Sequence, residues 1–292
     1  MRPTGRLALA SVAVIAVLAI TAWGVLGKSS GRSSANNVRQ TGASPTATAS
    51  ASPSPSQSSV ISGGGWKLKF SAGFTRPRLD TKVWGTCYPW RDLRSGCTNY
   101  GNPEYQWYLP AQDRVSQGAM ELIAQRVPTQ GRNKRGGPMM YGCRSGLVTT
   151  YPSLRFTYGY LQIVAKIPES YGLWPALWLA AADRSWPPEI DLLERWGAAP
   201  NTDLFFHPVG AHRVAQKAYV GNLSVGWHTF GLLWSSKQLV WYIDGRELLT
   251  VDKNIPNIPM YFIANVAEAR PVTATQGCDG TMYIQSVKLW QQ

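Results

Sequence analysis

The sequence predicts an all-β fold, a sandwich of antiparallel sheets. Short runs of alternating apolar residues recur between Gly, Pro and Asn turns, and no sustained 3.6-residue periodicity interrupts them. From Gly63 to the end the chain has about 230 residues, a length at which an all-β sandwich is still one domain. We find no internal repeat of 20–50 residues, so a propeller or solenoid is not expected.

Each predicted strand is a run whose apolar side chains alternate with other residues, so that one face of the strand is buried. The runs are 155–160, 161–167, 177–181, 228–234, 239–243, 260–265 and 282–289.

Two segments precede this domain. Residues 1–28 hold Arg2 and Arg6 followed by an uncharged run over 7–27, which predicts either a cleaved signal peptide or a retained membrane anchor. Residues 29–62 are rich in Ser, Thr, Pro and Ala and predict a disordered linker. We therefore expect export, with residues 63–292 extracellular, either secreted or tethered to the outer face of the cytoplasmic membrane.

The chain has four cysteines, Cys87, Cys97, Cys143 and Cys278. An even number in an exported domain predicts two disulfides, and three pairings are possible. Pairing Cys87 with Cys97 would close a short loop, and Cys143 with Cys278 would join early and late segments. Without a Cys-x-x-Cys pair and with only three histidines, we expect no metal site, and we expect no cofactor.

The folded part is basic, with 24 Lys and Arg against 16 Asp and Glu, a net charge of +8. No helix-turn-helix, ribonucleoprotein or zinc-finger pattern accompanies that charge, so we expect no nucleic-acid partner. An anionic polysaccharide or cell-wall surface is an electrostatic alternative, as is a role in solubility alone. We expect a monomer.

Three carboxylates, Glu189, Asp191 and Glu194, lie within six residues of an apolar stretch. In a strand, Glu189 and Asp191 share a face, whereas Glu194 would point the other way. A β-bulge at Leu192-Leu193 would return Glu194 to that face, and bulges recur beside active sites. A retaining glycosidase needs two carboxyl groups about 5–5.5 Å apart, which two glutamates on one bulged strand can approach. A solvated acidic face is the simpler alternative.

The neighbouring sequence resembles glycoside hydrolase family 16 over roughly residues 64–292. The motifs that carry the resemblance, in order, are Tyr158-Gly159-Tyr160, Lys166-Ile167-Pro168, Gly172-Leu173-Trp174-Pro175-Ala176-Leu177-Trp178-Leu179, Pro188-Glu189-Ile190-Asp191-Leu192-Leu193-Glu194, Gly226-Trp227-His228-Thr229-Phe230-Gly231, Leu239-Val240-Trp241-Tyr242-Ile243-Asp244-Gly245 and Val287-Lys288-Leu289-Trp290-Gln291. The resemblance implies a β-jelly roll whose concave sheet carries an open sugar-binding cleft.

The resemblance also implies roles for the carboxylates. It makes Glu189 the nucleophile and Glu194 the general acid and base, with Asp191 sharing hydrogen bonds between them. Three like charges packed together cannot all ionise readily, so at least one pKa should be raised.

A sugar cleft further needs flat apolar surfaces and polar groups for the sugar hydroxyls. Core packing is the alternative for each tryptophan, and Trp178, Trp234 and Trp241 are expected in the core. The residues predicted to contact substrate are Trp174, Trp186, Trp196 and His207, which surround the carboxylate strand, and Asn102 and Glu104, which match a further family segment.

We therefore expect an exported retaining endo-glycosidase acting on a β-linked polysaccharide, with β-1,3-glucan as the expected substrate. The bulged motif is shared by laminarinases, agarases and carrageenases, whereas lichenases usually carry the shorter Glu-x-Asp-x-Glu. A transglycosylase and a non-catalytic glycan-binding module of the same fold are the alternatives. Gln162 and Val164 replace the Glu and Arg of many members, which would change the substrate if these side chains lined the cleft.

Overall fold

The computed structural model describes residues 59–61, 64–100, 102, 104–196, 201–269 and 278–292. The predicted signal or anchor over 1–28 lies outside these residues, as does the linker over 29–62 except for a short 3-10 turn, η1 (Ser59–Ile61). Among the residues that are described, no helix is long and apolar enough to cross a membrane.

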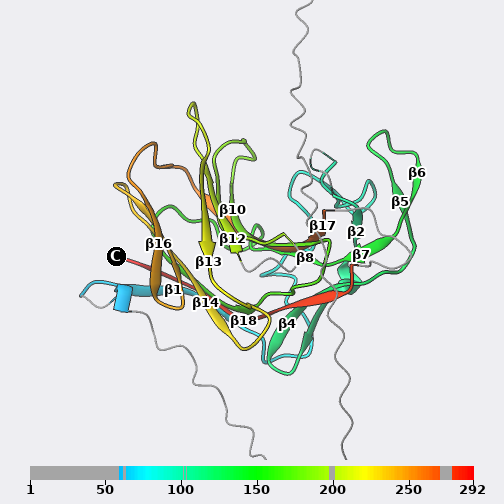
Figure 1. The fold of residues 1–292 in the computed structure, drawn as a ribbon, viewed down its shortest axis with the longest axis horizontal. Helices are drawn as coiled ribbons and strands as arrows, with labels where there is room; N and C mark the ends of the chain where they lie inside the picture. Colours follow the sequence, from blue (N-terminus) through cyan, green and yellow to red (C-terminus); the bar gives the residue numbers. More distant parts are fainter. Residues whose placement is uncertain (1–58, 62–63, 101, 103, 197–200, 270–277) are drawn as a thin grey trace, which may run out of the picture. The chain divides into compact units, whose positions relative to one another are not determined.

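Two antiparallel sheets make up the fold, which confirms the predicted all-β sandwich (Figure 1). The eight-stranded sheet contains, in spatial order, β16 (Arg246–Val251), β15 (Leu239–Ile243), β14 (His228–Trp234), β9 (Gly159–Lys166), β18 (Gly280–Gln291), β4 (Ala119–Ala124) and β3 (Asp113–Ser116), with β1 (Lys67–Gly73) also paired to β18. The six-stranded sheet contains β13 (Val214–Tyr219), β12 (Asn201–His207), β11 (Glu189–Glu194), β10 (Leu173–Ala181), β17 (Met260–Glu268) and β8 (Leu147–Thr149).

Two small pairs of strands complete the fold. β2 (Gln106–Tyr108) pairs with β7 (Cys143–Ser145) in parallel, and β5 (Thr129–Arg132) forms a hairpin with β6 (Pro138–Tyr141). A second short helix, η2 (Pro110–Gln112), lies between β2 and β3.

The main core lies between the two large sheets, because alternate side chains of each strand point inward. Leu161 and Ile163 of β9 meet Leu177 and Leu179 of β10 in one buried cluster. Each of these side chains is at most 1% exposed, so the apolar runs of the sequence supply the inner faces of both sheets.

The opposite face of the six-stranded sheet is also covered over part of its area. Ala176, Trp178 and Ala180 of β10 and Tyr261 and Ile263 of β17 form a second buried cluster there. The chain from the end of β1 to the end of β2 lies on this cluster and contributes Tyr88, Cys97 and Tyr108. This covering segment carries the polar residues that border the cleft described below.

Both predicted disulfides are present. Cys87 pairs with Cys97 within the covering segment, at a Cα–Cα distance of 5.0 Å, and Cys143 pairs with Cys278, at 6.1 Å. The second bond joins β7, which pairs with β2, to the chain just before β18 of the eight-stranded sheet.

Each predicted strand run except 155–160 corresponds to one strand, with boundaries that shift by up to four residues. The runs 228–234 and 239–243 match β14 and β15 at both ends. The runs 155–160 and 161–167 were wrong as separate strands, because one strand, β9, covers nearly all of 161–167 but only the last two residues of 155–160. Its start is set by Tyr158 and Gly159, whose φ angles of 63° and 132° are not extended.

The expectation that Gln162 and Val164 would affect the cleft is wrong. On β9, Leu161, Ile163 and Ala165 point into the core, so the two intervening side chains lie on the opposite, outer face of the eight-stranded sheet. The whole core separates them from the cleft face of the other sheet, so they do not choose the substrate by contact.

Candidate active site

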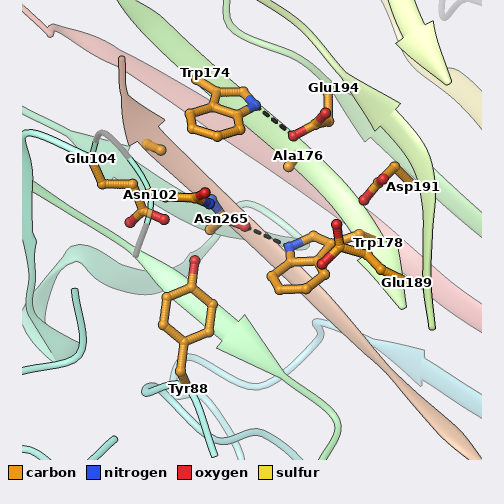
Figure 2. Close-up of a pocket in the computed structure, with 11 residues that line it drawn as sticks. Tyr88, Asn102, Glu104, Trp174, Ala176, Trp178, Glu189, Asp191, Glu194 and Asn265 are labelled. Carbon is orange, nitrogen blue, oxygen red and sulfur yellow. Dashed lines mark hydrogen bonds between the residues drawn. The ribbon is translucent and has the colours of Figure 1, made fainter. Parts of the chain in front are cut away.

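Strand β11 carries the three carboxylates, and it contains the predicted bulge. Leu177 of β10 pairs with Leu193, but the next residue, Trp178, pairs with Asp191, so Leu192 has no partner on β10. The register to β12 shifts over the same residues. Ile190, Leu192 and Leu193 are buried in the core, and Glu189, Asp191 and Glu194 all line one cavity on the other face (Figure 2).

Two side chains from neighbouring strands donate hydrogen bonds to the backbone of β11. The indole N–H of Trp241, a core residue of β15, donates to the carbonyl oxygen of Asp191 at 2.8 Å. The hydroxyl of Thr202 on β12 donates to the carbonyl oxygen of Glu194 at 2.9 Å. These contacts fix the middle and the end of the carboxylate strand.

Burial makes the charged form of all three carboxylates costly. It raises the pKa of Glu189 to about 7, although a hydrogen bond from Trp186 opposes the rise. Burial and the charge of Glu189 raise the pKa of Glu194 to about 8, against the N–H of Trp174, which donates to its Oε1 at 2.8 Å. Burial, then both glutamates, hold the pKa of Asp191 well above its usual range. Carboxyl groups of this strand can therefore stay protonated at neutral pH.

Aromatic side chains flank both ends of the strand. Trp174 and Trp196 stack at a centroid distance of 4.1 Å beside Glu194. At the other end, Trp186 lies 5.6 Å from the ring of His207. Nε2 of His207 is 3.6 Å from Glu189 Oε1 and 3.8 Å from Asp191 Oδ2. Burial, with the nearby charge of Arg213, lowers the pKa of His207, so its ring is neutral at neutral pH.

A fourth carboxylate, Glu104, lies across the cavity from β11 (Figure 2). Burial raises its pKa to about 7, although hydrogen bonds from Gln106, Asn99, Asn102 and Tyr108 lower it. The amide of Gln106 donates to Glu104 Oε2 at 2.7 Å, and its oxygen accepts from the backbone N–H of Glu268 on β17 at 2.7 Å. β2 thus connects Glu104 to the floor of the cavity.

Asn265 of β17 lies at the centre of that floor. Its Oδ1 accepts from the indole N–H of Trp178 at 2.8 Å, and its Nδ2 donates to the hydroxyl of Tyr108 at 3.0 Å. Figure 2 shows the hydroxyl of Tyr88 directed toward the same amide. A rigid polar floor faces the carboxylate wall.

A larger cleft, of about 620 Å³, continues from this cavity along the sheet. Every residue that the sequence predicted for the site lines one or both spaces, including Asn102, Trp186 and Trp196. Whether each contacts substrate stays a prediction. Trp234 and Trp241 are core residues, each 1% exposed, whereas Trp178, expected in the core, is buried but borders the cleft.

Several lining residues were missed by the sequence reasoning. They are Tyr88, Trp90, Asn99, Ala176, Ala180, Ala181, Arg184, Ser185, Phe205, Arg213, Asn265 and Ala267. Alternation along β17 could have placed Asn265 on the cleft face, since Phe262, Ala264 and Val266 point into the core. Tyr88 and Trp90 come from an irregular segment with no periodicity to read.

The ligand atoms of Glu189, Asp191 and His207 lie within 4.8 Å of one another, close enough to share a cation. The paired carboxyl groups can exchange protons without one, and the expectation of a metal-free site stays a prediction.

Comparison with known proteins places this site in a family. The model of "Glycosyl hydrolases family 16" matches residues 106–285, more than half of the chain. An endo-1,3-1,4-beta-glycanase, EglC, of Rhizobium meliloti (strain 1021) is 34% identical over 199 residues, which are 63% of this chain and 42% of that protein. A second one from the same organism, ExsH, is 32% identical over 198 residues.

Among solved structures, the catalytic domain of an endo-1,3-beta-glucanase (laminarinase) from Thermotoga petrophila RKU-1 superposes with a TM-score of 0.67. It is 23% identical, and the match covers 78% of this chain and 98% of that one. The likeness shows the same fold. The matched region spans less than half the length of the two curated relatives, 42% of each.

Proposed function

The chain belongs to family 16 of the glycosyl hydrolases, and from that premise we propose that it is a retaining endo-hydrolase of β-glucan. The observation that carries the proposal is the bulged strand β11, which turns Glu189, Asp191 and Glu194 to one cleft beside the stacked pair Trp174 and Trp196. A solvated acidic face would leave these carboxylates exposed, whereas Asp191 is only 3% exposed.

In the first step, the ionised carboxylate of Glu189 attacks the anomeric carbon of the bound sugar. The glycosidic C–O bond breaks as the carboxylic acid of Glu194 gives its proton to the leaving oxygen, and a glycosyl ester of Glu189 forms. The assignment of the two roles follows the family resemblance. Burial raises the pKa of both glutamates, to about 7 and about 8, so the interacting pair can hold one proton at a pH where the other has begun to leave.

In the second step, the carboxylate of Glu194 takes a proton from water, whose oxygen attacks the anomeric carbon and displaces Glu189. Two inversions give net retention. Burial and both glutamates raise the pKa of Asp191, which favours its protonated form. A protonated carboxyl can donate a hydrogen bond to Glu189, which favours the ionised nucleophile.

The substrate proposal rests on the cleft and on the relatives. The 620 Å³ cleft extends past both glutamates, with Trp186 lining it at one end and Trp196 at the other, as binding of a chain across the site requires. Curated relatives are named for β-1,3-1,4 bonds and a structural neighbour for β-1,3 bonds. We propose β-1,3-glucan, with mixed-linkage β-1,3-1,4-glucan as the second substrate.

Incubation of the full chain with laminarin, mixed-linkage β-glucan, agarose and xyloglucan, followed by sizing of the products, tests the proposal. We expect oligosaccharides of intermediate size from the first two polymers. Early products followed by NMR should show the β anomer first. Release of monosaccharide alone would exclude internal cutting, and an α-anomer burst would exclude retention. Larger products formed from added oligosaccharide would indicate a transglycosylase, and binding without products a glycan-binding module.

We also propose that the protein is exported and acts as a monomer. Two disulfides in the described chain are typical of oxidising compartments. Cell fractionation and light scattering test these two points, and recovery in the cytoplasm with free thiols would contradict export.

A further inference from the structure

Building on the proposed function, we infer that this cleft accepts a β-glucan that carries carboxylate substituents, recognised by Arg184 and Arg213. Both arginines line the 620 Å³ cleft together with Trp186, Phe205 and His207. They approach it from two different loops. Arg184 lies between β10 and β11, and Arg213 immediately precedes β13. Since Glu189 begins β11 and pairs with His207 at the end of β12, both loops lie at the Glu189 end of the carboxylate strand.

Neither arginine is neutralised by an ion pair. Among the described residues, no carboxylate oxygen lies within 4.0 Å of a nitrogen of Arg184 or Arg213. Arg213 instead lies over the ring of Phe205, 4.6 Å from its centroid, and Arg184 contacts the hydroxyl of Tyr151 at 3.5 Å. Both side chains are exposed. A guanidinium that rests on an aromatic ring keeps its N–H groups free to bind a carboxylate in a bidentate manner.

The charges along the cleft allow an anionic ligand at the Glu189 end. Arg184 and Arg213 are the cationic side chains among the residues that line the cleft. Lys217 pairs with Asp203, which pairs with Glu194, so its charge lies at the opposite end of the carboxylate strand. Asp191 and Glu194 would repel an anion if both were ionised, but burial raises the pKa of each. The two guanidinium groups are therefore the cations that an anionic substituent would meet at the Glu189 end.

Arg213 could instead act only on the catalytic carboxylates, and this alternative predicts a different experimental result. Its charge lowers the pKa of Asp191 and Glu194, so it could serve only to balance the catalytic carboxylates. In that case its loss would shift the pH profile of hydrolysis equally on neutral and anionic glucans. Recognition of a substituent would instead change the ratio of kcat/KM between the two substrates.

The test compares neutral laminarin with lightly carboxymethylated β-1,3-glucan of the same chain length, at low ionic strength. We expect the wild-type full chain to prefer the carboxymethylated glucan. The kcat/KM ratio of anionic to neutral substrate should fall about tenfold in Arg213→Gln and again in Arg184→Gln. Arg114→Gln, which removes an exposed charge from the edge strand β3 of the other sheet, should leave the ratio unchanged.

Binding separates this inference from the proposed function. Affinity electrophoresis of Glu194→Gln in gels that contain either glucan measures recognition without hydrolysis, with and without Arg213→Gln. Retardation by carboxymethylated glucan that Arg213→Gln relieves supports the inference even if neither polymer is cut, an outcome that would reject only the hydrolase proposal. Equal retardation by both glucans, or a ratio that Arg213→Gln and Arg184→Gln leave unchanged, would overturn it.

Discussion

At the scale of single residues, Glu194 shows how its surroundings set its proton affinity. Burial and the neighbouring charge of Glu189 favour the protonated acid, and the indole N–H of Trp174 favours the carboxylate by donating to it at 2.8 Å. The first two effects win, so the pKa lies at about 8. Because Glu189 and Glu194 interact, the pair loses its two protons in two titration steps, and each apparent pKa describes the pair rather than one residue.

We expect Glu189→Gln and Glu194→Gln to fold but to lose at least about a hundredfold in hydrolysis, because each removes one acid–base or nucleophilic role. Asp191→Asn should lose less, since its carboxamide can still donate a hydrogen bond. Reducing ends released from laminarin measure the activity, and circular dichroism checks the fold. Activity within tenfold of wild type in either glutamine variant would contradict the assigned roles.

The raised pKa of Glu194 also has a consequence for stability. The unfolded glutamate loses its proton near its ordinary pKa of 4.5, while the folded one keeps it up to about 8. Between these values the native state binds more protons than the unfolded state, so this group's contribution to stability falls as pH rises. Replacement of Glu194 by a neutral residue should remove this pH-dependent loss of stability.

We therefore expect Glu194→Gln to raise the urea midpoint of unfolding at pH 8 and to have little effect at pH 4. Chemical denaturation at the two pH values measures the difference. Glu247→Gln, at an exposed position of β16, is the control and should change the midpoint equally at both. A Glu194→Gln variant that is more stable than wild type only at pH 4 would contradict the argument.

At the scale of elements, the bulge in β11 decides which way the acid points. Without it, the sequence separation of five between Glu189 and Glu194 would place them on opposite faces. The extra residue, Leu192, has no partner on β10 and packs into the core beside Leu193, both being at most 2% exposed. The bulge thus keeps two leucines in the core and three carboxylates in the cleft.

Deletion of one of these two leucines should restore a regular strand, Glu-Ile-Asp-Leu-Glu, in which all three carboxylates still share a face. We expect this variant to lose stability through the missing buried side chain, about 2–5 kcal/mol, and yet to keep measurable hydrolysis. Leu192→Ala, which loses side-chain contacts but keeps the bulge, is the matched control. Complete inactivity of a folded deletion variant, with an active Leu192→Ala, would show that the bulge itself is required.

At the scale of the described domain, the cleft depends on how the covering segment is attached. This segment supplies Tyr88, Trp90, Asn102 and Glu104 to the cleft but has little regular structure of its own before β2. One disulfide closes it locally over a separation of 10 residues, and the other joins β7 to the start of β18 over 135. Chain entropy in the unfolded state makes the longer closure more stabilising.

We expect Cys143→Ala/Cys278→Ala to lower the free energy of unfolding by about 5 kcal/mol and Cys87→Ala/Cys97→Ala by about 3 kcal/mol, following the dependence on loop length. Relative to its loss of stability, the Cys87→Ala/Cys97→Ala variant should lose more hydrolytic activity than the Cys143→Ala/Cys278→Ala variant, because the Cys87–Cys97 bond lies in the segment that borders the cleft. Thermal unfolding and laminarin hydrolysis on both variants measure these effects. A larger loss of stability from the short loop would contradict the entropic ranking.

Much of this molecule follows from local patterns. Alternation of apolar residues predicts the strands and the sandwich, because each strand buries one face. The same period predicts the bulge, since Glu189 and Glu194 cannot otherwise share a wall. The family motifs also lead to Trp174, Trp186 and Trp196, all of which line the cleft.

Only the tertiary structure decided which distant residues meet these. Asn265 faces Trp178 and Tyr108 because β17 pairs with β10 and the covering segment lies above both. Gln162 and Val164 proved remote because β9 belongs to the other sheet. The raised pKa values of the carboxylates likewise arise from burial by segments far away in the chain. Sequence periodicity reports which face of a strand is buried, but pairing between strands determines what that face meets.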